Sequence, residues 1–258
     1  MDRAIITSLS NPQAKQIRAL RQRKGRALSG LFVVEGLHPV GEAIEAGWDI
    51  DSILYAPDVL TSSFANALLV HNASKLQPVS HEVMDALADK ENPQGILAIV
   101  HQRRVALSEI SQVRRAVGMV APQDPGNVGT VLRTMDAVDA HALILVDGGV
   151  DPYHPTSVRA SMGALFWKPV VQVSFAELLT WSGSHEMHLV GTSAHAEIDY
   201  RRFAPVEPWL LLLGSEQKGL SPDRLAACEA AISLPMRGRA SSLNLAVAAG
   251  ILLYQFTS

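Results

Sequence analysis

Polar side chains and glycines gather at three places where apolar runs of the sequence end. These places are residues 125–134, 213–220 and 232–244. Glycine lets a ligand approach the backbone, and a helix N-terminus favours an anion. Ligands of open parallel sheets bind at such strand ends, where the loops begin. We therefore take the three segments as the candidate site.

The first two segments each carry one charged residue suited to chemistry. In the first, Asn127 and Arg133 are six residues apart, which is about 600° of helix rotation, so they need not share a face. Arg133 can still reach a phosphate or a ribose over the helix edge, although a solvated surface arginine is the simpler interpretation. In the second, an apolar strand runs into a glycine turn that holds Glu216; alone, this is also typical of a plain tight turn.

The third segment is a small, basic, hydroxyl-rich loop that leads into a long helix. Asn244 lies in the first turn of that helix, and residues 243–256 are apolar nearly all round. A helix of this kind must be buried, either in the core or in a subunit interface.

Two other chemistries fit the sequence poorly. Residues 191–195 contain a serine and a histidine, but not in the Gly-x-Ser-x-Gly order of a hydrolase elbow. His185 and His188 are three residues apart, yet no carboxylate or cysteine cluster accompanies them. We expect neither a hydrolase nor a metal site.

The elements that must position these residues alternate between strand and helix. The first hundred residues predict helices at 12–25, 36–46, 62–69 and from 80, and strands at 31–34, 53–55, 76–79 and 95–100. The second half predicts strands at 116–121, 142–146, 170–173, 187–192, 209–213 and 231–234, and helices at 127–138, 155–165, 174–181 and 243–256. This alternation indicates an α/β protein with a parallel sheet covered on both faces. Because arginine-rich residues 101–115 interrupt the pattern, we expect domains at 1–100 and 116–258 with a linker at 101–115.

The composition is that of a folded protein with a large core. Of 258 residues, 48% are hydrophobic and 18% are charged. A single cysteine, Cys228, excludes an intrachain disulfide and fits a reducing compartment. No apolar run of a secretory signal follows the first residues, and the longest apolar stretch, 245–254, is too short to span a bilayer. We therefore expect a cytoplasmic protein without a membrane span.

The charge is unevenly distributed along the chain. Residues 1–30 contain seven Lys and Arg against Asp2 alone, a net +6, which leaves −9 for the remainder of a chain whose net charge is −3. Such a basic head is typical of a local contact with a polyanion, although a solvated helix face is equally consistent with it. The candidate RNA-binding side chains are Lys15, Arg18, Arg21, Arg23, Lys24 and Arg26.

Together, the three segments resemble motifs 1, 2 and 3 of the SpoU/TrmH family of RNA ribose 2′-O-methyltransferases. The matching stretches are NVGTVLRT (127–134), LLLLGSEQKGLS (210–221) and ISLPMRGRASSLNLAVAAGILLY (232–254). Residues 150–170 are similar to the family's middle segment, and ITSLSNPQAKQIRAL and FVVEGLHPVGEAI resemble the substrate-binding domain often fused to it. The ordered set covers nearly the whole chain, which makes the resemblance specific.

The resemblance implies a fold, a cofactor and a substrate. The N-terminal domain would be a small, ribosomal-protein-like α/β fold, and the catalytic domain an α/β trefoil knot, a rare exception to the absence of knots in proteins. The knotted loops would hold S-adenosylmethionine, and the substrate would be RNA, with ribosomal RNA favoured by the separate N-terminal domain. The positions that match or adjoin the family's cofactor site are Thr192, Ser193, Gly214, Ser215, Glu216, Leu234, Met236 and Leu243.

The family's catalytic and substrate-site polar positions are matched by Asn127, Arg133, Glu216, Ser242 and Asn244. The resemblance also implies a homodimer, with Arg133 of one subunit near the cofactor of the other and the apolar C-terminal helix at the interface. A guanidinium rarely loses its proton in a protein, so we expect Arg133 to stabilise developing negative charge, not to act as a free base. We expect Glu216 and Asn244 to position other groups.

Two positions depart from the family pattern. Asp139 stands where a glycine usually follows the first-motif helix, and His38 where an arginine is common after Glu35 and Gly36. Neither departure removes a catalytic position. Two alternative functions stay open: a methyltransferase of transfer RNA, and a non-catalytic RNA-binding or assembly factor with this fold, against which the retained polar set speaks.

Overall fold

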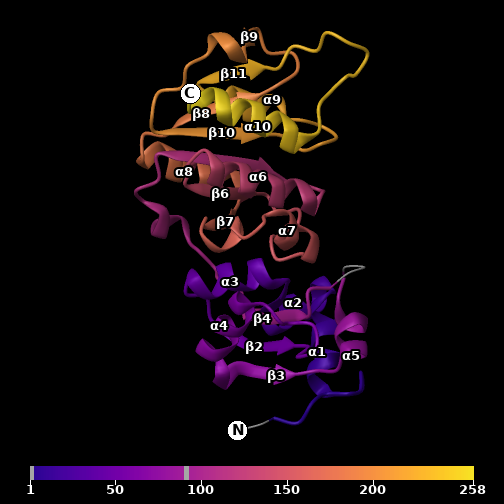
Figure 1. Cartoon of the computed structure of the whole chain (residues 1–258). Helices are drawn as coiled ribbons and strands as arrows, with labels where there is room; N and C mark the ends of the chain where they lie inside the picture. The colour runs from indigo at the N-terminus through magenta and orange to yellow at the C-terminus, as the bar shows by residue number, and fades with distance from the viewer. Residues whose placement is uncertain (1–2, 90–92) are drawn as a thin grey trace. The chain divides into compact units, whose positions relative to one another are not determined.

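The structure, a computed structural model, describes residues 3–89 and 93–258 and divides the chain into two compact units (Figure 1). The first unit comprises Met1–Arg103 and Tyr153–Phe166, and the second comprises Arg104–Pro152 and Trp167–Ser258. The chain therefore leaves the second unit at Tyr153 and returns to it at Trp167.

The first unit contains a mixed four-stranded sheet in the order β1-β4-β2-β3. Strand β4 is antiparallel to β1 and β2, whereas β2 and β3 are parallel. The strands are β1 (Leu31–Glu35), β2 (Ile50–Tyr55), β3 (Leu76–Pro78) and β4 (Ile96–His101). The helices are α1 (Pro12–Leu20), α2 (Arg23–Ser29), α3 (Leu37–Glu45), α4 (Ser63–His71), α5 (His81–Leu87) and α7 (Pro155–Ala160), with short 3-10 turns η1 (Ala73–Lys75) and η3 (Ala164–Phe166).

The first helix begins as predicted but ends early. Asn11 caps α1 by accepting a hydrogen bond from the backbone N–H of Gln13 at 2.9 Å. The single helix predicted to reach Gly25 is wrong, because the chain breaks after Leu20 and a second helix, α2, runs across Gly25. A side chain on Gly25 would collide with the carbonyl of Ala19, so glycine is what allows α2 to cross the end of α1 this closely.

An aromatic cluster joins residues 153–166 to the core of the first unit. The ring of Phe32 lies 4.6 Å from that of Tyr153, and the ring of Trp48 lies 5.3 Å from that of Phe166. The indole N–H of Trp48 donates to the backbone carbonyl of Phe166 at 2.9 Å. Residues 153–166, although they follow strands of the second unit in sequence, therefore complete the core of the first.

Three left-handed backbone positions, at residues 139, 162 and 163, shape turns of the chain. The helix predicted at 155–165 instead ends at Ala160, and Met162 (φ 50°) and Gly163 (φ 99°) turn the chain before η3. Asp139 has a φ of 54°, the conformation that a glycine supplies most easily and that aspartate also tolerates. The departure at Asp139 therefore keeps the turn, and Lys168 lies 3.8 Å from its carboxylate.

The second unit contains a seven-stranded sheet, parallel throughout, in the order β7-β6-β5-β10-β8-β11-β9. Its strands are β5 (Arg115–Val120), β6 (Ala142–Val146), β7 (Val170–Val173), β8 (His188–Thr192), β9 (Ile198–Asp199), β10 (Trp209–Leu213) and β11 (Ala230–Ser233). The predicted α/β class with a parallel sheet is confirmed, while the short edge strand β9 was not predicted. Every residue of β6 and β10 is buried, as their unbroken apolar runs require.

Helices α6 (Pro125–Ala137) and α10 (Leu245–Phe256) pack against each other in the second unit (Figure 1). The others are α8 (Phe175–Ser184) and α9 (Pro222–Ala226), with 3-10 turns η2 (Leu107–Ile110) and η4 (Tyr200–Arg202). Among residues 3–89 and 93–258, no helix is both long and apolar enough to cross a membrane.

Candidate functional site

The carboxyl ends of four neighbouring strands bring the three polar segments together. Strand β10 lies between β5 and β8, and β8 pairs on its other side with β11. The registers place Leu213 beside Met119 and Ile232 beside Thr192. Residues 125–134, 213–220 and 232–244 follow β5, β10 and β11, so they leave the same edge of the sheet despite their separation in sequence.

Asn127, Glu216 and Asn244 form a continuous chain of hydrogen bonds at this edge. The side-chain amide of Asn244 donates from Nδ2 to Oδ1 of Asn127 at 3.0 Å. The Nδ2 of Asn127 donates in turn to Oε1 of Glu216 at 3.0 Å. One bonded chain therefore connects the start of α10, the start of α6 and the turn after β10.

The start of α10 fixes the direction of these hydrogen bonds. Asn244 is the N-cap of that helix, and its Oδ1 accepts hydrogen bonds from the backbone N–H groups of Ala246 at 2.9 Å and Val247 at 3.3 Å. Its amide nitrogen must then face Asn127, whose own oxygen must face Asn244. The only group that Asn127 can offer to Glu216 is a donor, which matches a carboxylate.

Glu216 is held in the charged form by donors from the opposite loop. Its carboxylate also accepts from the backbone N–H groups of Gln123 at 3.1 Å and Asp124 at 3.4 Å. Partial burial raises the pKa of Glu216, but the hydrogen bonds from Asn127 and the backbone N–H groups outweigh it and bring the pKa below its usual value. Glu216 is therefore suited to hold the loop before α6 and poorly suited to be a general base near neutral pH.

Residues 123 and 124 contribute to the site although they were not among the predicted site residues. Their backbone N–H groups bind Glu216, and the side chain of Asp124 caps α6 by accepting from the N–H of Gly126 at 2.7 Å. The Asp124-Pro125 pair is a recognisable helix start, and this signal could have placed the start of α6 at residue 125 in place of the predicted residue 127. Nothing in the sequence indicates the backbone contacts to Glu216.

Arg133 and Ser242 lie outside the hydrogen-bonded chain. Both are exposed, and within the described part of the chain neither side chain has a hydrogen bond or ion pair. Arg133 is on α6, six residues after Asn127. Its guanidinium is thus free to meet a substrate or a second subunit.

The predicted cofactor positions line the ends of β8, β10 and β11. Thr192 Oγ1 donates to the carbonyl of Leu212 at 3.2 Å, and the N–H of Ser193 donates to Ile232 at 3.0 Å. Gly214 follows β10, and any side chain there would collide with the backbone of Gly219. These turns are therefore closely packed and fixed by backbone contacts.

Apolar side chains remain accessible beside this polar edge. Met236 and Leu243 are 36% and 38% exposed, and Leu234 is half-buried. Exposed apolar groups beside backbone donors and acceptors suit an adenosyl group, which has an apolar ring face and polar edges. The residues present therefore fit S-adenosylmethionine.

Contacts within the first unit reduce the number of cations in the basic N-terminal residues 1–30 that are available to bind RNA. Arg26 is 1% exposed and its Nη1 donates to the carbonyls of Leu20 at 2.9 Å and Arg21 at 3.0 Å, so it caps the end of α1 and is withdrawn as an RNA contact. Arg21 is itself paired with Asp89 at 3.2 Å. Of the six predicted RNA-binding side chains, four remain exposed: Lys15, Arg18, Arg23 and Lys24.

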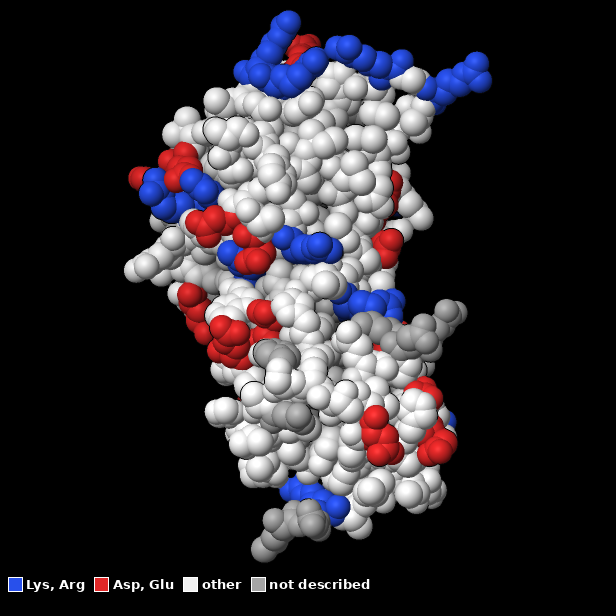
Figure 2. All heavy atoms as spheres, in the orientation of Figure 1, with Lys and Arg blue, Asp and Glu red and all other residues white. Residues whose placement is uncertain are grey.

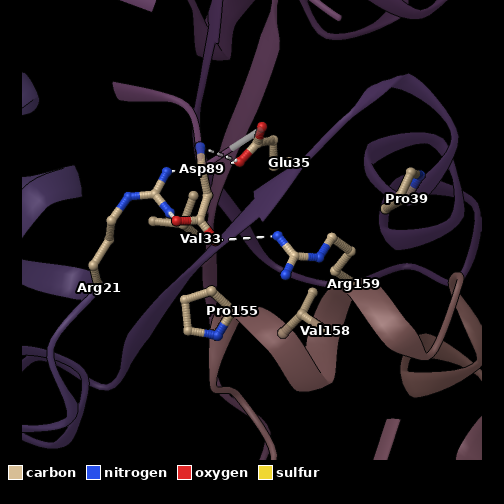
Figure 3. Close-up of a pocket in the computed structure, with 8 residues that line it drawn as sticks. All are labelled: Arg21, Val33, Glu35, Pro39, Asp89, Pro155, Val158 and Arg159. Atoms are coloured by element: carbon tan, nitrogen blue, oxygen red, sulfur yellow. Dashed lines mark hydrogen bonds and ion pairs between the residues drawn. The ribbon is translucent and has the colours of Figure 1, made fainter. Parts of the chain in front are cut away.

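A small hollow in the first unit is filled by ion pairs (Figure 3). Arg21 and Arg159 both reach Asp89, the latter at 3.1 Å, and Arg21 lies 3.6 Å from Glu35. None of the predicted cofactor or catalytic residues lines it. Because the charges compensate one another, we assign this hollow a structural role in fastening α7 to the first unit.

Comparison with known proteins identifies both parts of the chain. Residues 114–254 match the family model described as the SpoU rRNA Methylase family, and residues 11–98 match an MRM3-like substrate binding domain. The chain is 35% identical over 260 residues to the 23S rRNA (uridine(2479)-2′-O)-methyltransferase of Streptomyces viridochromogenes, covering 97% of this chain and 90% of that protein.

Two further similarities extend over nearly the whole chain. The 23S rRNA (guanosine(2553)-2′-O)-methyltransferase of Bacillus subtilis is 28% identical over 249 residues, with 96% of this chain and 97% of that protein covered. The crystal structure of the AdoMet-bound rRNA methyltransferase from Sinorhizobium meliloti superposes with a TM-score of 0.88 at 35% identity, covering 98% of this chain and 96% of the other.

Proposed function

Because this chain belongs to the SpoU rRNA methylase family, we propose that it transfers a methyl group from S-adenosylmethionine to a ribose 2′-hydroxyl of 23S ribosomal RNA. The observation that carries the proposal is the hydrogen-bonded chain from Asn244 through Asn127 to Glu216, which links all three motifs at one sheet edge. The two relatives are named for different nucleotides of 23S rRNA, so the proposal extends to this RNA and not to one nucleotide.

We assign the residues at this end of the sheet to two groups, those that bind the cofactor and those that contact the substrate. Residues Thr192, Ser193, Gly214, Ser215, Glu216, Leu234, Met236 and Leu243 would hold the cofactor. When bound, S-adenosylmethionine supplies a methyl group on a positively charged sulfur, which needs no further activation. The chain's task is then mainly alignment of the 2′-oxygen with that methyl group.

Arg133 is the residue we propose to act on the substrate. Its exposed guanidinium has no partner in the described residues, and a fixed cation near the 2′-oxygen stabilises the negative charge that develops as the hydroxyl proton leaves. Ser242 lies two residues before Asn244 in the sequence and is proposed as a second polar contact to the ribose. Asn127 and Asn244 keep the two helix starts at a fixed spacing.

We also propose that the active form is a homodimer. Val247 and Tyr254 on α10 are 51% and 59% exposed and lie two turns apart on one face. Helix α10 also packs against α6, on which Arg133 lies. Dimerisation through this face of α10 covers the apolar groups and brings Arg133 toward the partner's cofactor site, as the family resemblance implies.

The remaining expectations are part of the same proposal. We propose a substrate-binding domain at 1–100, a linker at 101–115 and a knotted methyltransferase domain at 116–258, with residues 153–166 packing on the first unit. Because the proposed substrate is ribosomal RNA, we also propose that the protein acts in the cytoplasm.

Calorimetric titration with S-adenosylmethionine, paired with labelled methyl transfer to total RNA, tests the proposal. We expect saturable binding and label in the large ribosomal RNA. Arg133→Lys should retain measurable methyl transfer because the charge is kept, whereas Arg133→Ala should lose methyl transfer. The matched control is Arg114→Ala, which removes an exposed arginine at the amino ends of the strands. Absence of S-adenosylmethionine binding would favour a non-catalytic RNA-binding factor.

A further inference from the structure

Two arginine-bearing segments leave the second unit side by side at its sheet edge. Strand β9 pairs in parallel with β11, with Asp199 opposite Ser233, and Ser233 Oγ donates to the carbonyl of Ile198 at 3.3 Å. Turn η4 with Arg202 therefore follows one strand end, and the loop 234–244 follows the other. Figure 2 shows Lys and Arg side chains gathered at this end, over β9 and the loop before α10 of Figure 1.

Three arginines of these segments are exposed and unpaired. Arg202, Arg237 and Arg239 are exposed, and within residues 3–89 and 93–258 none of them has an ion pair or hydrogen bond through its side chain. We call them the strand-end arginine cluster. Arg201, in contrast, is bound to Asp199, and that hydrogen bond lowers the pKa of Asp199 to about 2.

The charge of the cluster is only partly offset. Glu197 is exposed in the same segment, so three unpaired arginines face one acid and leave a local excess of two positive charges. The rest of the chain beyond the basic head is acidic, and the head itself has lost Arg21 and Arg26 to internal contacts. An RNA strand that reaches the site therefore meets the positive charge of this cluster in addition to that of Arg133 and Lys218, which are also exposed.

We infer that the strand-end arginine cluster is a second RNA-binding surface, which contacts phosphates flanking the target nucleotide. The inference rests on the proposed function, because it takes RNA as the substrate that enters the site at this edge. Guanidinium groups on an exposed loop and a short turn suit phosphate oxygens in a bent or single-stranded segment. Such contacts fix the position of the strand and carry no sequence information themselves.

The test compares salt dependence of RNA binding between variants. Anisotropy of a fluorescein-labelled RNA hairpin is measured for the full chain, for Arg202→Gln, and for the double variant Arg237→Gln/Arg239→Gln. Each lost phosphate contact should reduce the slope of log affinity against log salt by about 0.7–0.9 and weaken binding about 4- to 5-fold at physiological salt. Affinity for S-adenosylmethionine should stay unchanged, and the Michaelis constant for RNA should rise.

A matched control separates this surface from general charge effects. Arg114 is also an exposed arginine, but it precedes β5 at the amino ends of the strands and pairs with Glu207 at 2.9 Å, so Arg114→Gln should keep the wild-type slope. A slope in the cluster variants equal to that of Arg114→Gln, or a loss of S-adenosylmethionine affinity in step with RNA affinity, would overturn the inference. Since binding is measured without methyl transfer, failure of the proposed activity alone leaves the cluster intact.

Discussion

Replacing Asn127 with aspartate places a carboxylate oxygen where an amide donor now faces Glu216. The two atoms are 3.0 Å apart, and two unit charges at that separation repel by about 5 kcal/mol at the effective dielectric of a protein surface. Glu216 is exposed on one side, which reduces this value, and uptake of a proton by the pair limits it further. We expect Asn127→Asp to lower the free energy of unfolding by about 2–4 kcal/mol at pH 7.

The sign of the pH dependence follows from the same pair. Repulsion raises the pKa of the carboxyl pair in the folded protein above the unfolded value, so the penalty is present at pH 7 and is relieved as pH falls through the raised pKa. At pH 5 the cost should fall to about 1 kcal/mol, because supplying the proton costs about 1.4 kcal/mol less per pH unit.

Urea unfolding at pH 7 and pH 5, followed by circular dichroism, measures this difference. Asn127→Ala removes the donor to Glu216 and also the acceptor for Asn244 without adding a charge, so its cost should not depend on pH in this range. Asn11→Asp is the matched control, because Asn11 accepts only a backbone N–H at a helix N-cap and aspartate serves equally there. Equal destabilisation of Asn127→Asp at both pH values would refute the hydrogen bond between Asn127 and Glu216.

Three further predictions concern other parts of the molecule. The His141 ring accepts a hydrogen bond from a backbone N–H at the start of β5, and burial lowers the pKa of this histidine. Because the folded protein favours neutral His141, the stability that is present above about pH 6.5 should be lost as pH falls through the lower pKa of the folded state. Urea unfolding of His141→Asn should show less of this loss. Phe166→Ala should cost about 3 kcal/mol in urea unfolding, because Phe166 is 4% exposed in the aromatic cluster; a cost under about 1 kcal/mol would contradict the packing of residues 153–166. Burial raises the pKa of the Cys228 thiol from 9.0 to about 11, so iodoacetamide at pH 8 should alkylate it about 100-fold more slowly than a free thiol; labelling at the rate of unfolded protein would exclude this burial.

The sequence predicts most elements of the fold because long apolar runs dominate them. Strands β6 and β10 are fully apolar and buried, and helix starts at Asn11 and Ser80 carry clear caps. Strand β9 has only two residues, too few to show any period. The break before α2 depends on the close crossing at Gly25, a tertiary contact that local propensity does not contain.

The candidate site could likewise be predicted only in part from the sequence. Apolar strands followed by glycine turns predict that residues 127, 216 and 244 meet at one edge, because parallel strands end together. The direction of the hydrogen bonds depends on side-chain orientation, which appears only in the folded chain. Arg26 was predicted as an RNA contact from charge alone, but it is buried, because the carbonyls that end α1 need donors.

The identity of the methylated product tests the proposed activity most directly. Transcribed, unmodified 23S ribosomal RNA is incubated with the chain and methyl-labelled S-adenosylmethionine and then hydrolysed with alkali. A ribose 2′-O-methyl group removes the hydroxyl that attacks the neighbouring phosphodiester, so we expect the label in an alkali-resistant dinucleotide and, after enzymatic digestion, in one 2′-O-methylnucleoside. Label in a base-methylated nucleoside, or no label in RNA while S-adenosylmethionine binds, would contradict ribose methylation.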